Sequence, residues 1–135
     1  MDQIIPGLYQ TSYSEFQGAR HLDAVVVLNR QTPRQQQGRI IIHWPIDDGP
    51  MPSPEKTRAI SRWVAELLES DMTVAVQCAA GINRSGLITS RALIELGHPP
   101  QEAVELVRQA RPGALTNRAF VDWLLQEQPP EESSR

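Results

Sequence analysis

The sequence predicts a single α/β domain, with a central, mostly parallel sheet of about four to five strands flanked by helices on both faces. Three observations carry this prediction. Apolar runs rich in β-branched residues occupy residues 24–28, 39–44 and 73–77, as in strands that are buried on both faces. Segments with helical periodicity follow the second and third runs. The length of 135 residues is the usual size of one domain.

The N-terminal segment predicts two short extended pieces joined by a turn. Pro6-Gly7, a turn-forming pair, separates two apolar pairs within the first ten residues. The apolar runs at 24–28 and 39–44 then follow, with the polar segment 29–38 between them. We expect that segment to be either a solvated connection or part of the rim of a pocket, because it carries Arg30 and Arg34.

Four helices are predicted in the remainder of the chain. The first begins at Pro54, with Ser53 as its N-cap. The others begin near Arg84, Pro100 and Asn117. The first helix has an apolar face at i, i+3, i+4, i+7 and i+8, formed by Ile60, Trp63, Val64, Leu67 and Leu68. Gly97 is expected to end the second helix and Pro112-Gly113 the third.

The overall composition limits the classes of function. We expect a folded domain at residues 1–128 and a disordered, Pro-rich tail at 129–135. A net charge of -3 argues against nucleic-acid binding, and no apolar run approaches the ~20 residues of a membrane span. One cysteine excludes an intramolecular disulfide, and the N-terminus lacks a signal peptide, so we expect a cytoplasmic protein. The three histidines lack metal-ligand spacing, so no metal and no cofactor are expected.

The segment AVQCAAGINRSG, residues 75–86, joins the third apolar run to a helix. A strand–loop–helix of this kind binds anions, because loop N–H groups and the positive end of the helix dipole point at the same place. Cys78, the single cysteine, lies at the base of the loop, where this field favours the nucleophilic thiolate. Arg84 supplies a planar fork that matches two phosphate oxygens, and Gly81 permits backbone geometry that a Cβ would obstruct.

The loop therefore combines a nucleophile, an anion cradle and a charge clamp, which is what phosphoryl transfer to sulfur requires. A plain structural interpretation would make Cys78 a buried strand-end residue and Arg84 a surface residue. The presence of Gly81, Arg84 and Ser85 in one register disfavours it. We expect the phosphate to be bound by the residues between the cysteine and the arginine, together with that arginine: Ala79, Ala80, Gly81, Ile82, Asn83 and Arg84.

The Cys-x5-Arg spacing, with Gly81 inside it and Ser85 after it, resembles the signature of the cysteine-dependent protein tyrosine phosphatases. The chain is most similar to their small dual-specificity branch, through segments that occur in family order: IIPGLY, VVVL, PIDDGPMPSPE, the signature itself and RPGALTNRAF. We call residues 78–85 the signature loop. The resemblance implies that Cys78 is the nucleophile, that Arg84 binds phosphate, and that Ser85 hydrogen-bonds the sulfur and stabilises it as a leaving group.

The family takes the proton for its leaving group from an aspartate on a separate upstream loop. Residues 46–54 resemble that loop, and we call them the acid loop. Asp48 aligns best when Pro52, Pro54 and the following helix are used as anchors, so we expect it to be the general acid and then the general base. Asp47 is the alternative.

Two further positions relate to the family pattern. The family usually has histidine before the cysteine, where it braces the loop and helps to keep the thiolate, but this chain has Gln77. An amide can brace by hydrogen bonding but carries no charge, so we expect lower activity or an optimum at higher pH. Asn117 matches an asparagine that buttresses the signature and acid loops, and it also suits a helix N-cap.

The variable positions of the signature loop indicate the substrate class. They carry no charge, whereas members of the superfamily that act on inositol lipids or RNA 5′ ends have basic residues there. A phosphorylated protein or a small phosphate monoester is therefore the expected partner, bound in a shallow, dual-specificity pocket. Two alternatives remain: a catalytically weak phosphate- or phosphopeptide-binding module, and a rhodanese-like sulfurtransferase. The sequence does not predict the oligomeric state.

Overall fold

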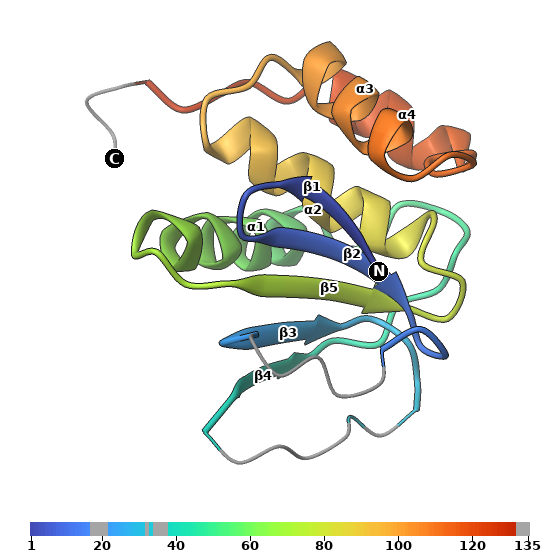
Figure 1. The fold of residues 1–135 in the computed structure, drawn as a ribbon. Helices are drawn as coiled ribbons and strands as arrows, with labels where there is room; N and C mark the ends of the chain where they lie inside the picture. The colour runs from blue at the N-terminus through green and yellow to red at the C-terminus, as the bar shows by residue number, and fades with distance from the viewer. Residues whose placement is uncertain (17–21, 32, 34–37, 132–135) are drawn as a thin grey trace.

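One five-stranded sheet forms the centre of the protein (Figure 1). The structure is a computed structural model and describes residues 1–16, 22–31, 33 and 38–131. The strands lie in the order β1-β2-β5-β3-β4, and all neighbours are parallel except the antiparallel pair of β1 and β2. Their bounds are Asp2–Ile5 (β1), Leu8–Ser12 (β2), Ala24–Val27 (β3), Ile40–His43 (β4) and Val74–Cys78 (β5). The predicted α/β class and mostly parallel sheet are confirmed.

The strand register places the carboxyl ends of the four parallel strands at one edge of the sheet. Ser12 of β2 pairs with Cys78 of β5, and Val27 of β3 pairs with Gln77 of β5. His43 of β4 pairs with Val27 on the outer side. In parallel α/β sheets ligands bind beyond the carboxyl ends of the strands, so this edge is where a site is expected.

Four helices follow the predicted starts: Pro54–Glu69 (α1), Arg84–Glu95 (α2), Pro100–Ala110 (α3) and Arg118–Leu125 (α4). Local capping explains where two of them begin. The Ser53 side chain accepts a hydrogen bond from the N–H of Lys56 at 3.2 Å, and the Asn117 side chain accepts one from the N–H of Phe120 at 3.2 Å. Each cap satisfies a backbone donor that the first helical turn leaves unpaired.

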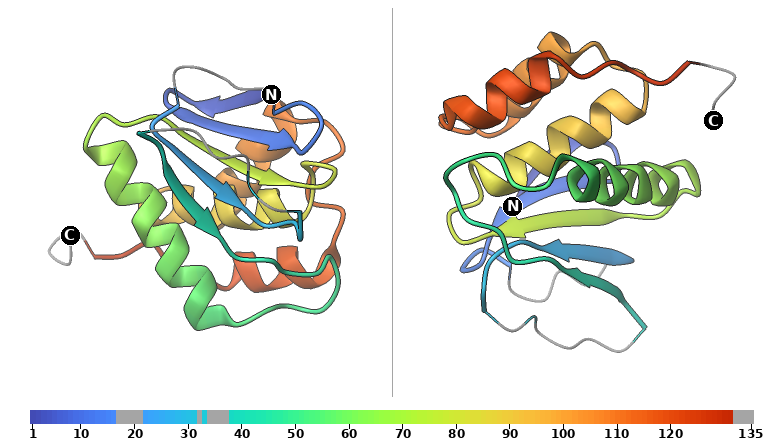
Figure 2. Two further views of the ribbon diagram at one scale, coloured as in Figure 1. Left: turned by 90° about the horizontal axis from the view of Figure 1, so that it is seen from below. Right: turned by 180° about the vertical axis from the view of Figure 1, so that it is seen from behind.

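The four described helices cover one face of the sheet (Figures 1 and 2). α2 is buried along nearly its whole length, because it packs on β2 and β5 and is flanked by α1, α3 and α4. The other face is covered by Phe16 and Leu22, which pack on Val25, Val27 and Ala75. Helices were expected on both faces; within the described ranges they lie on one, and the connections that belong to the other face are described only in part.

The direction of the crossovers explains the difference. The β2–β3 and β4–β5 connections cross the sheet in opposite directions, so two right-handed crossovers must lie on opposite faces. α1 belongs to the β4–β5 connection. The second face is therefore left to the β2–β3 and β3–β4 connections, which cross in the same direction; residues 17–21, 32 and 34–37 of these connections lie outside the described residues.

An ion cluster connects the helices behind the sheet. The carboxylate of Glu127, just after α4, accepts hydrogen bonds from Arg58 of α1 at 2.8 and 2.9 Å and from Arg91 of α2 at 2.8 Å. Arg91 also bonds Glu95 at 2.7 Å, and its side chain is only 4% exposed. Burial works to raise the pKa of Glu127, but the hydrogen bonds from Arg58 and Arg91 outweigh it and leave that pKa below its ordinary value.

Within the described ranges, no helix combines the length and the apolar character that crossing a membrane requires. The predicted tail begins at residue 129. Residues 129–131 have no regular secondary structure, and residues 132–135 lie outside the described part of the chain.

Candidate active site

Cys78 is the last residue of the central strand β5, and it is 1% exposed. The Gly81 N–H donates a hydrogen bond to its Sγ at 3.1 Å. The Ser85 Oγ is hydrogen-bonded to the same Sγ at 3.3 Å. Ser85 lies in the first turn of α2, so the sulfur contacts both the turn of the signature loop and the start of the helix that follows.

Gly81 occupies a position that admits no side chain. Its φ is +72°, in the left-handed region that favours glycine. A Cβ there would lie 2.7 Å from the backbone of Thr11 and Ser12 and 2.7 Å from the Arg111 guanidinium. The loop therefore packs directly on the end of β2, and glycine is required both by conformation and by space.

Arg84 is the first residue of α2 and is partly buried. Its Nη1 donates a hydrogen bond to the carbonyl of Ile46, in the acid loop, at 3.1 Å. Together with Ala79, Asn29, Arg30 and Gln31 it lines a pocket of about 500 Å³. Arg84 thus connects the signature loop, to which it belongs, with the acid loop, and its side chain forms part of the pocket wall.

Asp48 is held by two amide side chains. Asn83 Nδ2 donates to one carboxylate oxygen at 2.9 Å, and Asn117 Nδ2 donates to the other at 2.7 Å. Asn117 also donates to the carbonyl of Gly49 at 2.9 Å while its Oδ1 caps α4. Both of the functions considered for Asn117 in the sequence analysis are therefore seen in the structure.

Asn83 joins three segments. Its Oδ1 accepts the backbone N–H groups of Thr116 and Asn117 at 2.7 and 2.9 Å, while its Nδ2 donates to Asp48. The side chain is buried, at 6% exposed. Because Asn83 belongs to the signature loop, the acid loop is fastened directly to the signature loop.

Asp47 points to a different partner. Its carboxylate accepts a hydrogen bond from Arg30 Nη2 at 2.8 Å, and both side chains are exposed. Arg30 is one of the residues that line the pocket with Arg84. The two adjacent aspartates are thus separated: Asp48 is bound to the signature loop and Asp47 to the connection between β3 and β4.

Gln77 braces the neighbouring strand. Its Nε2 donates to the Asn29 side chain at 3.1 Å, and its backbone carbonyl accepts the N–H of Leu28 at 2.8 Å. The backbone carbonyl of Asn29 in turn accepts a hydrogen bond from His43 Nε2, 2.9 Å away, if that nitrogen carries the proton. The amide at the histidine position of the family is therefore occupied in connecting β5 to the end of β3.

The sequence analysis did not identify Gln10 or Arg111. Gln10 is fully buried in β2 and bonds the signature loop, and Arg111, after α3, does so as well. One signal was available for Gln10: it lies two residues after the core residue Leu8 on a strand, so it faces the core, where an unpaired amide would be costly.

Fold and site together define a class, the cysteine-based phosphatase domains. Comparison with known proteins identifies the family within that class. Residues 7–129 match the family described as "Dual specificity phosphatase, catalytic domain", and this chain belongs to it. The rhodanese-like and binding-module alternatives are not favoured by this match.

Relatives and solved structures agree with that assignment. The chain is 35% identical to "Protein tyrosine phosphatase PRL-1" of Trypanosoma cruzi, over 70% of this chain and 55% of that protein. It is 31% identical to "Protein tyrosine phosphatase type IVA 3" of Mus musculus, over 65% of this chain and 52% of that protein. The chain therefore spans about half the length of these curated relatives. The crystal structure of Tk-PTP in the active form has a TM-score of 0.76 and 29% identity, and covers 92% of this chain and 94% of that one.

Proposed function

We propose that this protein is a tyrosine- or dual-specificity phosphoprotein phosphatase that hydrolyses phosphate monoesters through a cysteinyl-phosphate intermediate. The observation that carries the proposal is the convergence of the Gly81 N–H and the Ser85 hydroxyl on the Cys78 sulfur, at the head of α2. The Gly81 N–H donates to the sulfur, and the Ser85 hydroxyl becomes a second donor once the thiol has lost its proton, so this arrangement suits the nucleophilic thiolate. The same donors and the helix N-terminus suit a phosphate dianion.

In the first step the Cys78 thiolate attacks phosphorus, the sulfur–phosphorus bond forms, and the bond from phosphorus to the ester oxygen breaks. Protonated Asp48 gives its proton to the departing oxygen. Arg84 and the N–H groups of the signature loop bind the phosphoryl oxygens as their charge develops. The hydrogen bond from Asn83 to Asp48 supports this assignment of the acid, because it fixes Asp48 to the loop where the reaction takes place.

In the second step Asp48, now a carboxylate, takes a proton from water as the water oxygen attacks phosphorus. The sulfur–phosphorus bond breaks, inorganic phosphate is released, and Cys78 leaves as a thiolate. The Ser85 hydroxyl, 3.3 Å from the sulfur, donates a hydrogen bond that stabilises this leaving group. The chemistry needs no cofactor.

The pocket supports the substrate class. It is lined by Asn29, Arg30, Gln31, Ala79 and Arg84, and the variable side chains of the signature loop carry no charge. A single phosphate on a protein side chain fits this chemistry better than a substrate with several phosphates. We assign the catalytic domain to residues 1–128, followed by the tail at 129–135, and we assign the protein to the cytoplasm.

Hydrolysis of p-nitrophenyl phosphate as a function of pH tests the proposal. The wild-type protein should release phosphate, whereas Cys78→Ser and Arg84→Ala should each reduce turnover to the level without enzyme. Phosphate binding without hydrolysis at any pH would instead identify a binding module. Formation of thiocyanate from thiosulfate and cyanide would identify a sulfurtransferase.

A further inference from the structure

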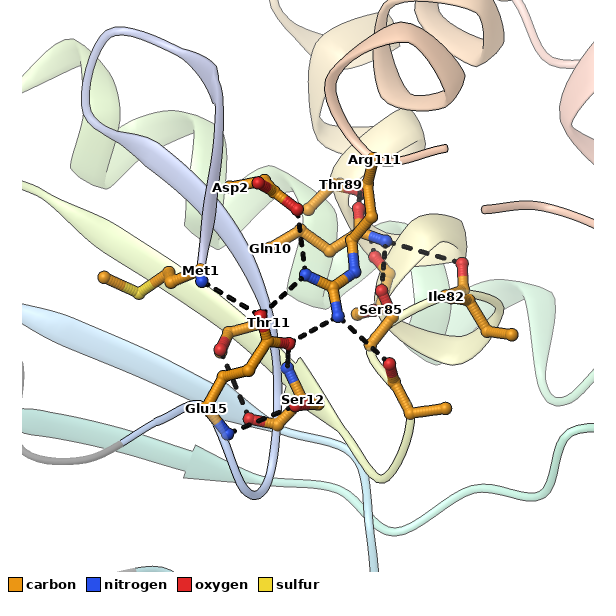
Figure 3. A network of polar contacts seen from close by, with 12 residues as sticks. Met1, Asp2, Gln10, Thr11, Ser12, Glu15, Ile82, Ser85, Thr89 and Arg111 are labelled. Carbon is orange, nitrogen blue, oxygen red and sulfur yellow. Dashed lines mark hydrogen bonds and ion pairs between the residues drawn. The ribbon is translucent and has the colours of Figure 1, made fainter. Parts of the chain in front are cut away.

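The backbone carbonyls of the signature loop are held from outside the loop (Figure 3). Arg111 Nη2 donates to the carbonyl of Ala80 at 3.1 Å. Gln10 Nε2 donates to the carbonyl of Gly81 at 2.9 Å and approaches that of Ile82 at 3.4 Å. These two side chains come from β2 and from the segment after α3, so elements distant in sequence meet on the loop.

A hydrogen bond that fixes a backbone carbonyl also fixes the direction of the N–H group in the same peptide unit. A peptide unit is planar and trans, so a carbonyl oxygen and the N–H of the next residue point in opposite directions. The Ala80 carbonyl, bonded by Arg111, shares its peptide unit with the Gly81 N–H, which donates to Cys78 Sγ. The Gly81 carbonyl, bonded by Gln10, shares its unit with the Ile82 N–H, which therefore points away from Gln10.

Gln10 is itself fixed in orientation. It is 0% exposed, and its Oε1 accepts a hydrogen bond from the Thr89 hydroxyl at 2.7 Å. The acceptor end of the amide is therefore directed at α2, and the donor end must face the signature loop. The carbonyl of Ser85, 3.0 Å from the Thr89 hydroxyl, is a second acceptor for the same single proton.

Arg111 is fixed by two carboxylates. Nη1 donates to Asp2 at 2.9 Å, and the guanidinium also bonds Glu15, which is seen beside it in Figure 3. Hydrogen bonds from Arg111 and Ser12 hold the pKa of Glu15 well below its ordinary value, so the pair stays charged at neutral pH. The Arg111 side chain is only 12% exposed, which leaves the guanidinium little freedom to leave the Ala80 carbonyl.

We infer that Gln10 and Arg111 are positioning residues, which orient two consecutive peptide units of the signature loop so that their N–H groups face the sulfur and the phosphate. The inference rests on the proposed function, because it concerns the same anion cradle. Neither side chain contacts the substrate in this scheme. Each acts through the loop backbone, and loss of either releases one peptide unit to rotate.

Gln10→Met and Arg111→Met test the inference, since each keeps an unbranched side chain and removes the donors. We expect each to weaken the binding of inorganic phosphate, measured by titration calorimetry, by about tenfold, and to lower kcat/KM for p-nitrophenyl phosphate by about tenfold or more. Removal of one oxyanion donor costs about 10²–10³-fold, and a donor that is loosened rather than removed should cost less. Arg111→Lys, which retains a charged donor, should recover part of both losses.

Arg58→Met is the matched control, because Arg58 is also an ion-paired arginine but contacts Glu127 and not the signature loop. It should lower the urea midpoint of unfolding while leaving phosphate affinity and kcat/KM within twofold of wild type. If Gln10→Met does not fold, Thr89→Val replaces it, since loss of the 2.7 Å bond frees the Gln10 amide to turn. Methionine variants that lose stability as Arg58→Met does, yet bind phosphate like wild type, would overturn the inference. Phosphate affinity is measured without turnover, so a wild-type protein that binds phosphate but does not hydrolyse the ester would refute only the proposed function.

Discussion

Asn83→Asp removes the hydrogen bond that holds Asp48, the proposed general acid, and keeps the contacts of residue 83 with the backbone of residues 116 and 117. The substitution keeps an oxygen that accepts the N–H groups of Thr116 and Asn117, and it replaces the amide that donates to Asp48 by a second carboxylate. A hydrogen bond to a charged group contributes about 1.5–3 kcal/mol, which corresponds to about 10- to 100-fold in the rate of a step that depends on it. The whole contribution of a general acid, about 10²–10⁴-fold, is the upper limit of this loss.

The assay compares two esters. Hydrolysis of phenyl phosphate, whose leaving oxygen needs a proton, should fall by the full 10- to 100-fold. Hydrolysis of p-nitrophenyl phosphate, whose leaving group is already stable as an anion, should fall much less. Asp48→Asn should show the same dependence on the leaving group.

The result that would refute this reasoning is a wild-type rate on phenyl phosphate in Asn83→Asp. If Asp47→Asn gave the selective loss on phenyl phosphate and Asp48→Asn gave none, Asp47 would be the acid. The exposed ion pair between Asp47 and Arg30 would then be the contact that positions the acid.

Two further predictions follow from individual contacts. Gln77→His should raise kcat/KM near neutral pH, because an imidazolium beside the signature loop stabilises the thiolate. Equal pH–rate profiles for the two proteins would show that the Gln77 amide supports the reaction as well as histidine does. Glu127→Gln should lower the free energy of unfolding, measured by urea titration, by about 3 kcal/mol, because buried Arg91 loses a charged partner. A loss no larger than that of Glu55→Gln, at an exposed position, would contradict this. Since the pKa of Glu127 is lowered in the folded protein, its carboxylate contributes stability above its ordinary pKa of about 4.3, and this contribution should disappear as the pH falls below that value.

Local signals predicted most of the fold. Ser53, Pro54 and Asn117 mark helix starts because caps act through contacts within a single turn, and all three were placed correctly. The apolar face of α1 was predicted less well, because Trp63 is 42% exposed. The buried residues of α1 include small or polar side chains such as Ser61 and Ala65, and a search for large apolar residues does not detect them.

The contacts of the candidate site were likewise predicted where they are local in sequence and missed where they are not. The spacing of Cys78 and Arg84 is a local property of one loop, and their juxtaposition with Ser85 could be predicted from the sequence. The contacts of Gln10 and Arg111 with that loop join residues 71 and 31 positions apart, and only the folded chain brings them together. The hydrogen bond from Asn83 to Asp48, which joins residues 35 positions apart, also depends on the fold.

The ion cluster around Glu127 has a consequence for synthesis of the protein. Arg91 and Arg58 are translated long before the carboxylate that binds both of them, and Arg91 is buried in the finished protein. A nascent chain therefore cannot close its helical layer without leaving a charge poorly compensated until residue 127 has left the ribosome. The residue just after the last helix thus ties completion of the helical layer to the C-terminal segment, and a chain truncated before residue 127 should fold less stably.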